Sequence, residues 1–415
     1  MRRRLRILRQ SPELERPGNP VVVRVYMHAR TAHLERQTQS ANGVLLYVRT
    51  RYDFDDTLAQ AANAYQCGVV SALCRVYRTR PRIIEINEPF LVNAWPLSVP
   101  LILLVRAMSA VTRGPSPTIV TYAIDNSDPA EVLHRKFRLP LAVARAIAYT
   151  VARFCVRRID RIAFGTQGAL EAYRSIVSNR LGHQTNVIEA LPTFRRDIAL
   201  AADSSKPGNT VLFLGAFEDR KGVLELVDAW PAVRAAAPSA ELIVVGKGPL
   251  EPEVRRRVAE MKPAARVVVD PPRSEIFSLL ADAKVVVLLS KRELGWREQV
   301  GLPICEGLAS GCEIVTTGET GLAEWLASNG HRVIPEPSTD SIVDALAAAI
   351  FDERLPQEII ESLPLEDGRL IADRWMTCDD LEDCPQSNLS RSGGRRDSIP
   401  KRGFEKLESD GVMER

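Results

Sequence analysis

The chain has 415 residues, of which 45% are hydrophobic and 26% are charged. This balance is close to that of average globular proteins and excludes a wholly disordered, collagen-like or integral-membrane protein, while the length predicts two domains. The net charge of +3 hides an asymmetry, because residues 1–200 contain 29 Lys and Arg against 15 Asp and Glu, and residues 201–415 contain 26 against 37.

An excess of basic residues in the first half is typical of proteins that face an anionic membrane surface, a phosphorylated lipid or nucleic acid. The sequence shows no helix-turn-helix, RNA-recognition or zinc-finger pattern, so we do not expect nucleic acid as a partner. Arg-rich usage in a GC-rich genome explains the same charge equally well.

Three features of the sequence bear on where the protein works. The seven Cys residues form no C-x-x-C pair and have no His at zinc-ligand spacing, which favours a reduced, cytosolic setting. The Arg-rich start has no apolar segment behind it and so does not resemble a secretory signal. The longest apolar run, 97–105, contains Pro100 and is far shorter than the ~20 residues that span a bilayer. We therefore expect a cytoplasmic protein without a membrane-spanning helix.

In the first half, apolar runs that suit buried strands alternate with longer helical patterns. The runs lie at 21–27, 44–48, 82–86, 118–124, 161–165 and 186–190, and the helical patterns at about 57–79, 94–111, 131–158 and 167–178. This alternation predicts a Rossmann-like domain over residues 1–190.

The second half shows the same alternation more regularly. Strands are predicted at 211–215, 241–246, 266–270, 284–290, 313–317 and 331–335, and helices at about 222–236, 251–261, 274–281, from near Pro303, 322–328 and 339–351. Continuous Val, Ile and Leu runs separated by helices indicate a parallel sheet that is buried on both faces. Residues 210–352 are therefore predicted to form a second doubly wound α/β domain.

Two stretches lack this apolar periodicity. Residues 191–209 are predicted to link the domains, which leave a cleft between them. Residues 353–415 form a C-terminal extension that is rich in Ser, Arg, Asp and Gly from about residue 379 and has little to bury. Disorder is the expected state of that last part.

Polar residues follow several predicted strands of the first domain. Glu88, Asp125 and Asn126 come directly after two of these strands, so they either line the cleft on the acceptor side or are ordinary loop residues. The D-x-D pattern in YDFDD (52–56) resembles a metal-binding motif, but Asp55 or Asp56 is better placed to cap a helix that starts near Thr57. The five His residues have no mutual spacing that suggests catalysis or metal binding, so no metal site is predicted.

The segment 289–317 carries the strongest chemical signal. Glu298 and Glu306 are separated by Gly301-Leu302-Pro303, and Pro303 suits the first position of a helix. Glu298 is then expected in the loop after a strand and Glu306 in the first helical turn, so both carboxylates meet at the carboxyl edge of the sheet. Carboxylates accept paired hydrogen bonds from vicinal hydroxyls, as on a sugar or ribose, and the backbone N–H groups near Gly301 and Leu302 suit a phosphate.

This segment resembles the retaining GT-B glycosyltransferases of glycosyltransferase family 4. Their E-x7-E motif has the form E-G-F-G-L-P-x-x-E-A-x-A-x-G, and this chain reads E-Q-V-G-L-P-I-C-E-G-L-A-S-G at 298–311. The resemblance covers about 209–352 and includes FLGAFEDRKGV (213–223), similar to the phosphate-binding strand-loop-helix, and VVGKGPL (244–250), similar to a G-x-G-P turn.

The resemblance implies a role for each matching residue. Glu298 would contact the transferred sugar, Glu306 the nucleotide ribose and Lys221 the diphosphate, with Gly215, Gly246, Gly248 and the 301–303 turn in the nucleotide-sugar site. Family members often have an Arg after the first glycine, whereas this chain has Ala216, so Arg220 is expected to supply the second cation. The Gly-rich loop after the first strand is absent, and Ala123 stands near the place of a common His, which leaves acceptor recognition open.

Together these residues predict a hexosyltransferase that takes a UDP- or GDP-sugar and a sugar or lipid-linked acceptor, in glycan or glycoconjugate biosynthesis. The resemblance implies retention of configuration, no metal or other cofactor, and a leaving phosphate oxygen that takes the acceptor proton. A sugar-nucleotide 2-epimerase on the same fold and a non-catalytic glycosyltransferase-like scaffold are the alternatives. The basic first half, with the RRRLRILR start, predicts reversible attachment to an anionic inner membrane face.

Overall fold

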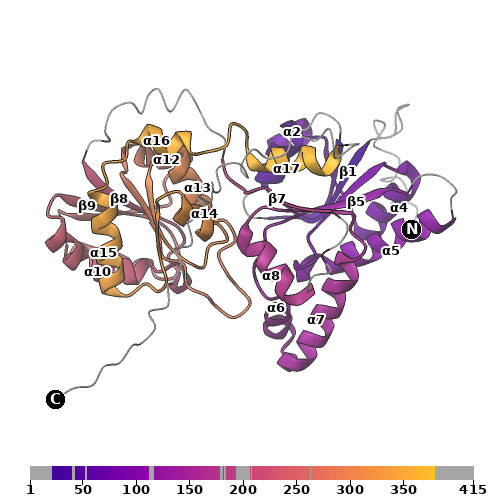
Figure 1. Cartoon of the computed structure of the whole chain (residues 1–415), viewed down its shortest axis with the longest axis horizontal. Helices are drawn as coiled ribbons and strands as arrows, with labels where there is room; N and C mark the ends of the chain where they lie inside the picture. The colour runs from indigo at the N-terminus through magenta and orange to yellow at the C-terminus, as the bar shows by residue number, and fades with distance from the viewer. Residues whose placement is uncertain are drawn as a thin grey trace, which may run out of the picture. The chain divides into compact units, whose positions relative to one another are not determined.

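The computed structural model describes residues 21–39, 43–51, 54–111, 116–177, 181, 184–192, 206, 208–261 and 263–378. Every named strand of this part lies in one of two parallel sheets with helices on their faces (Figure 1). Both sheets belong to one compact unit. The predicted α/β class with two doubly wound, Rossmann-like sheets is confirmed.

The first sheet has seven strands in the order β3-β2-β1-β4-β5-β6-β7. They are β1 (Val22–Ala29), β2 (Gly43–Thr50), β3 (Ala64–Gln66), β4 (Ile83–Ile86), β5 (Thr118–Ala123), β6 (Arg161–Phe164) and β7 (Gln184–Val187). Its connections contain α2 (Thr31–Gln39), α3 (Asp56–Ala61), α4 (Val69–Thr79), η3 (Val92–Ala94), α5 (Trp95–Val111), α6 (Pro129–Phe137), α7 (Leu141–Val156) and α8 (Gln167–Val177).

The second sheet has six strands in the order β10-β9-β8-β11-β12-β13. They are β8 (Asn209–Leu214), β9 (Ala240–Gly246), β10 (Ala265–Val269), β11 (Val285–Leu288), β12 (Glu313–Thr317) and β13 (Arg332–Ile334). The helices after β8 are η4 (Asp219–Lys221), α10 (Val223–Ala236), α11 (Glu251–Ala259), α12 (Arg273–Asp282), α13 (Leu302–Ala309), α14 (Ala323–Ser328), α15 (Thr339–Ile350), α16 (Pro356–Glu361) and α17 (Gly368–Thr377).

Strand order places a ligand-binding edge on each sheet. The order reverses between β1 and β4 in the first sheet and between β8 and β11 in the second. Loops that follow the strands on either side of such a reversal separate at the carboxyl edge, and ligands of doubly wound sheets bind there. The strand cores are continuously apolar, and all four residues of β11 are buried because helices cover both faces.

Two predicted helices are each broken by local backbone chemistry. The stretch expected to be one helix at 57–79 is α3, the short strand β3 and α4. Asn63 has a φ of 50°, which few residues other than Gly and Asn adopt, and Gly68 caps the start of α4. The stretch at 131–158 is α6 and α7, because Arg138 is left-handed and Pro140 starts the second helix. The helix α2 was not predicted.

The helix α17 returns to the first sheet, which the sequence analysis did not anticipate for the C-terminal extension. Its buried Ala372, Trp375 and Met376 share a hydrophobic cluster with residues of β1, β4 and β5. Its Asp373 also accepts a hydrogen bond from Arg24 of β1, whose guanidinium donates at 3.0 Å to Glu85 of β4. The extension therefore contributes to the core of the first sheet, while its residues from 379 lie outside the described part.

The helix Val92–Val111 corrects the expectation that no segment is long enough to span a bilayer. It has 20 residues with a mean hydropathy of 1.6, so by length and composition it qualifies as a candidate span. The apolar run at 97–105 is shorter than this helix, because the helix continues on both sides of the run and contains Pro100. Leu97, Leu101 and Val105 are fully buried in the core of the first sheet, so this face of the helix is occupied by protein.

Candidate functional site

The loops after β8 and β9 are held together by backbone hydrogen bonds at the carboxyl edge of the second sheet. Phe217 N–H donates to the Lys247 carbonyl at 2.9 Å, and Leu250 N–H donates to the Phe217 carbonyl at 3.0 Å. A Cβ on Gly246 would lie 1.8 Å from the Gly215 carbonyl oxygen, and one on Gly248 would lie 2.5 Å from that of Phe217. The G-x-G turn therefore has glycines because two backbones meet there, and it fixes the loop that leads to Lys221.

Lys221 and Glu298 meet at the reversal between β8 and β11. Lys221 ends η4 after β8, Glu298 lies in the loop after β11, and the ammonium forms an ion pair with Glu298 Oε2. Ser290 Oγ donates to the same carboxylate oxygen at 2.9 Å. Glu298 is only 9% exposed, so the pair is shielded from water and its electrostatic interaction is stronger than that of a surface pair.

Arg220 does not join this pair. Its Nε donates to Glu218 Oε2 at 2.6 Å, and its guanidinium stacks over the Trp296 ring at 4.1 Å from the centroid. Lys221 Nζ lies 5.0 Å from the same ring centroid. Trp296 is thus a platform under both cations of the loop, and it orients them through contacts with its π face.

The helix α13 differs slightly from its predicted start. It begins at Leu302, so Pro303 is its second residue, and Glu306 lies beyond the first turn in which it was expected. The shift follows from Gly301, which caps the helix with a φ of 78° that favours glycine. Glu306 remains near the carboxyl edge of the sheet, where Arg273 at the start of α12 pairs with it at 2.6 Å.

The polar residues predicted from the first sheet lie together. Glu88 accepts backbone hydrogen bonds from Ile124 at 3.0 Å and Asp125 at 2.9 Å. Burial, together with the charge of Asp125, raises the pKa of Glu88 to about 8. Burial also raises the pKa of Asp125, against hydrogen bonds from Ser127 and Gln299. This edge therefore holds a carboxyl group that keeps its proton at neutral pH.

Asn126 connects this cluster to the second sheet. Its Nδ2 donates to the backbone carbonyl of Glu298 at 3.0 Å, while its buried Oδ1 has no hydrogen-bond partner among the described residues. A second connection comes from Glu131 of α6, which accepts from Arg292 and from the Gly295 backbone, each at 3.0 Å. The loop that carries Glu298 is therefore held by residues of both sheets.

No metal site is evident in the part of the chain that the structure describes. No group of three or more His, Cys, Asp or Glu residues is arranged to hold a metal there. Asp55 caps α3 and accepts from Thr57 N–H at 2.8 Å, as predicted. Tyr52 and Asp53 of the D-x-D pattern lie outside the described residues. The absence of a cofactor stays a prediction.

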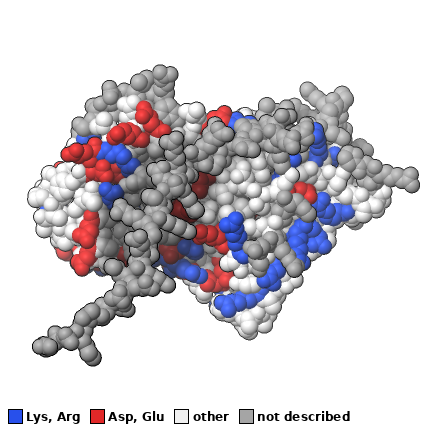
Figure 2. Space-filling view, in the orientation of Figure 1, with Lys and Arg blue, Asp and Glu red and all other residues white. Residues whose placement is uncertain are grey.

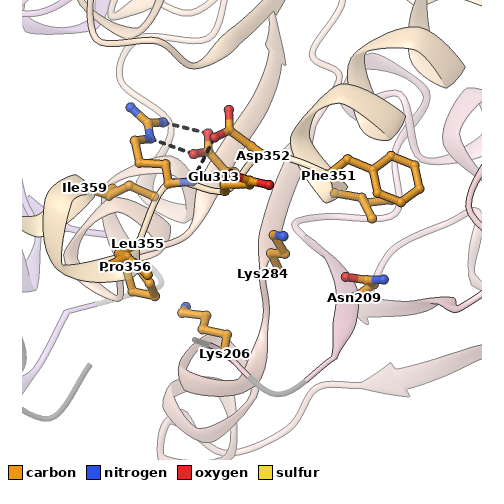
Figure 3. A pocket seen from close by; sticks show the side chains of 13 residues that line it. Lys206, Asn209, Lys284, Glu313, Phe351, Asp352, Leu355, Pro356 and Ile359 are labelled. Atoms are coloured by element: carbon orange, nitrogen blue, oxygen red, sulfur yellow. Dashed lines mark hydrogen bonds and ion pairs between the residues drawn. The ribbon is translucent and has the colours of Figure 1, made fainter. Parts of the chain in front are cut away.

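A cavity of about 390 Å³ lies at the opposite, amino edge of the second sheet (Figure 3). It is bounded by Asn209 at the start of β8, Lys284 before β11 and Glu313 at the start of β12. Glu313 accepts hydrogen bonds from Nε and Nη2 of Arg354, each at 2.7 Å. Since this cavity is remote from the loops after the strands, we do not assign it to the predicted site.

Three contacts at the site were missed by sequence reasoning. Ser290 donates a hydrogen bond to Glu298, and Trp296 stacks under Arg220. Arg273 forms an ion pair with Glu306. Ser290 and Trp296 lie inside the segment that carried the signal, so their nearness to Glu298 was a usable clue. Arg273 lies after another strand, and only the fold brings it to Glu306.

Comparison with known proteins finds similarity in the region of the second sheet. Residues 208–352 match the family profile described as glycosyl transferases group 1. The chain is 28% identical over 167 residues to the phosphatidyl-myo-inositol mannosyltransferase of Mycolicibacterium smegmatis. That match covers 38% of this chain and 42% of the mannosyltransferase, so the chain aligns with less than half of its relative's length.

Solved structures resemble the chain over both sheets. HepE of Anabaena, in complex with UDP and glucose, has a TM-score of 0.55 at 12% identity, covering 85% of this chain and 95% of its own. The apo lipopolysaccharide outer core galactosyltransferase WaaB has a TM-score of 0.58 at 13% identity, covering 82% and 94%. At this identity the likeness shows the fold alone. The likeness confirms the predicted GT-B fold, and within that fold the second sheet is the part that matches the glycosyl transferases group 1 profile.

Proposed function

We propose that this chain transfers a hexose from a UDP- or GDP-sugar to an acceptor hydroxyl, with retention of configuration and without a metal. One observation carries the proposal. Lys221, Glu298 and Glu306 lie around the β8/β11 reversal inside the segment that matches the glycosyl transferases group 1 family. HepE of Anabaena, which has this fold, is also known in complex with UDP-glucose, and this supports a nucleotide sugar as the class of donor.

The Lys221–Glu298 ion pair suggests how the donor enters. A diphosphate carries more negative charge than one carboxylate, so it competes with Glu298 for the Lys221 ammonium. Glu298 then turns its oxygens to the sugar hydroxyls, and Ser290 remains within hydrogen-bonding reach of it. Lys221, supported by Arg220 on Trp296, stabilises the charge that grows on the leaving diphosphate in the transition state.

Glu306 is proposed to hold the ribose hydroxyls. Its present partner, Arg273, has a side chain that is 65% exposed, so the ion pair is weak and can be replaced at little cost. The acceptor is proposed to approach from the first sheet, past Asn126 and the Glu88–Asp125 pair. The leaving phosphate oxygen takes the acceptor proton, and the oxygen of the acceptor forms the new glycosidic bond.

A location at a membrane surface is part of the proposal. The mannosyltransferase relative is named for a phospholipid headgroup, which favours a lipid-linked acceptor here. On the face shown in Figure 2, Lys and Arg gather over the helices of the first sheet. Phe137, Val143 and Ile147 of the α6–α7 region are 42–55% exposed, and Arg145 is exposed among them. Basic side chains next to exposed apolar ones suit a peripheral protein on the anionic inner leaflet.

Vesicle co-sedimentation tests this location. The wild type should sediment with anionic vesicles at low salt, should be released at high salt, and should ignore neutral vesicles. Changing Val143 and Ile147 to Ser should reduce sedimentation with anionic vesicles. The control Leu355→Ser changes an exposed apolar residue next to α16, outside the proposed membrane surface, and should not reduce it. Equal behaviour towards both vesicle types would leave a soluble enzyme with a diffusible acceptor.

Transfer assays across a panel of UDP- and GDP-sugars test the activity. We expect turnover with one donor class, and product stereochemistry will show whether configuration is retained. An interconversion of the donor without any acceptor would favour a 2-epimerase instead. A wild-type chain that binds no nucleotide and turns over no donor would favour a non-catalytic scaffold and contradict the proposal.

A further inference from the structure

A second cavity, of about 410 Å³, opens at the carboxyl edge of the first sheet. It lies over the ends of β1 and β2, between the starts of α4 and α5 and the end of α6. In strand order, β1 borders the reversal, and β5, which precedes Asn126, is two strands away. That separation is about 10 Å along the sheet edge.

The lining of this cavity is basic. His28, Arg49, Arg51 and Lys136 line it, and no Asp or Glu does so among the described residues. Neither Arg49 nor Arg51 forms an ion pair with a carboxylate of the described residues. Lys136 Nζ donates to Asn93 Oδ1, which is neutral and leaves the lysine charge uncompensated. Arg49, Arg51 and Lys136 are exposed, so water screens their mutual repulsion, but together they create a positive potential that attracts an anion.

His28 lies beside these cations with an unused polar atom. In parallel pairing it stands next to Arg49, and its buried Nδ1 has no hydrogen-bond partner among the described residues. Burial lowers the pKa of His28, and so do the four cations that face it: Arg51 and Arg49 around β2, Lys136 of α6 and Arg30 after β1. A bound anion reverses that effect, because it neutralises the cations and favours a protonated imidazole.

We propose that this cavity binds a phosphate group of the acceptor, as a phosphomonoester or phosphodiester. The inference rests on the proposed transfer function and deepens it by naming the acceptor class. Arg49 and Arg51 are suited to paired hydrogen bonds with phosphate oxygens, and Lys136 and His28 add donors. The cavity lies on the same edge of the sheet as Asn126, so an acceptor held here by its phosphate can extend along that edge towards the Glu298 loop.

His-ring NMR tests the site directly, because the chain contains only five His residues. The full chain, saturated with UDP to occupy the donor site, is titrated with inorganic phosphate, and the His28 signal is identified with a His28→Gln variant. We expect phosphate to shift the His28 signal and to raise its pKa. The double variant Arg49→Gln/Arg51→Gln should weaken phosphate binding at least tenfold.

The matched control is Arg174→Gln, which removes an exposed charge from α8 outside the cavity. It should leave phosphate affinity within twofold of the wild type. Equal losses in the double variant and in the control would mean that phosphate senses only general charge, and would overturn the inference. An unperturbed His28 signal at saturating phosphate would also overturn it. If UDP does not bind but phosphate still shifts His28, the transfer proposal fails and the anion site stands.

Two further arms separate the sources of the phosphate. Glucose 6-phosphate is compared with glucose, and phosphatidylinositol vesicles are compared with phosphatidylcholine vesicles. A response of His28 to glucose 6-phosphate supports a soluble phosphorylated acceptor, and sedimentation with phosphatidylinositol that the Arg49/Arg51 variant loses supports a lipid headgroup. If neither anionic probe is preferred over its uncharged or zwitterionic counterpart, the cavity does not recognise phosphate.

Discussion

The charged sites at the carboxyl edges of the two sheets differ in whether their cations are paired with carboxylates of the chain. At the second sheet, Lys221 is paired with Glu298 and Arg273 with Glu306. At the first sheet, Arg49 and Arg51 face a cavity that no described carboxylate lines. A site that neutralises itself must exchange its own partners for a ligand, whereas a site of like charges gains directly when an anion enters. The first arrangement favours reversible donor exchange, and the second favours selection of a charged acceptor.

Removing Glu298 should give the largest effect and sharpen the comparison on the donor side. Glu298→Ala should lower turnover about 10²-fold or more, the scale of a lost transition-state contact, while nucleotide affinity stays equal or improves slightly because Lys221 loses a competing partner. Steady-state kinetics and calorimetry on the same preparation separate the two. Glu293→Ala, an exposed carboxylate of the same loop, is the control. Near-normal turnover, or a parallel collapse of nucleotide affinity, would contradict the assigned role.

Glu306 should act on binding more than on chemistry. Loss of a charge-assisted hydrogen bond to the ribose costs about 1.5–3 kcal/mol, so Glu306→Ala should weaken UDP or GDP binding about tenfold or more. Calorimetry with the nucleotide alone measures this. Arg273→Gln removes only the competing partner and should leave affinity equal or slightly improved. A large loss in the Arg273 variant would mean that the ion pair itself builds the site.

The Glu88 carboxyl tests the first sheet through pH. Its pKa in the folded chain, about 8, is above its ordinary value because of burial and the charge of Asp125. A raised pKa stabilises the fold below the unfolded pKa, and the contribution is lost as pH rises towards 8. Glu88→Gln should therefore gain stability relative to the wild type as the pH rises from about 5 to about 8, by up to a few kcal/mol. Denaturant unfolding of both proteins across that range measures the gain. If the free energies of unfolding of the wild type and the variant change in parallel with pH, the prediction is wrong.

Asn126 should give the smallest effect. Its amide donates to the Glu298 carbonyl, a neutral hydrogen bond worth about 0.5–1.5 kcal/mol. Asn126→Ala should therefore lower turnover about threefold to tenfold without changing nucleotide affinity. Asn126→Asp keeps the size of the side chain but removes the donor, and it should be at least as impaired. Normal turnover in both variants would show that Asn126 does not help to position Glu298.

Much of this was predictable, because local signals and the fold agree in the second sheet. Continuous apolar strands fixed the order of elements there, and the Glu298–Glu306 spacing placed both carboxylates after β11. The start of α13 shifted by one residue because Gly301 favours a left-handed cap, which the motif alone does not reveal.

The parts that escaped prediction depend on contacts between distant segments. The helix α17 is weakly apolar, and residues far away in the sequence hold it in place. Arg24 donates to Asp373, Arg161 donates to the Cys378 carbonyl at 2.6 Å, and apolar residues of the first sheet pack against it. Arg273 starts α12, which follows β10, whereas Glu306 lies in α13, which follows β11, so only the folded sheet brings the two together. Arg49 and Arg51 read as ordinary basic residues until the sheet sets them beside His28 and Lys136. The net charge of residues 1–200 does not show whether the basic side chains are scattered over the surface or line one cavity.

Nucleotide calorimetry on Lys221→Gln tests the central claim most directly, that the β8/β11 reversal holds a nucleoside diphosphate. The wild type should bind UDP or GDP, and the variant should bind at least tenfold more weakly because it loses a charge-assisted contact with the diphosphate. The matched control Lys284→Gln changes a lysine at the amino edge of the second sheet, remote from this reversal, and it should bind normally. Equal affinity in the wild type and Lys221→Gln, or no binding of either nucleotide to the wild type, would contradict the account.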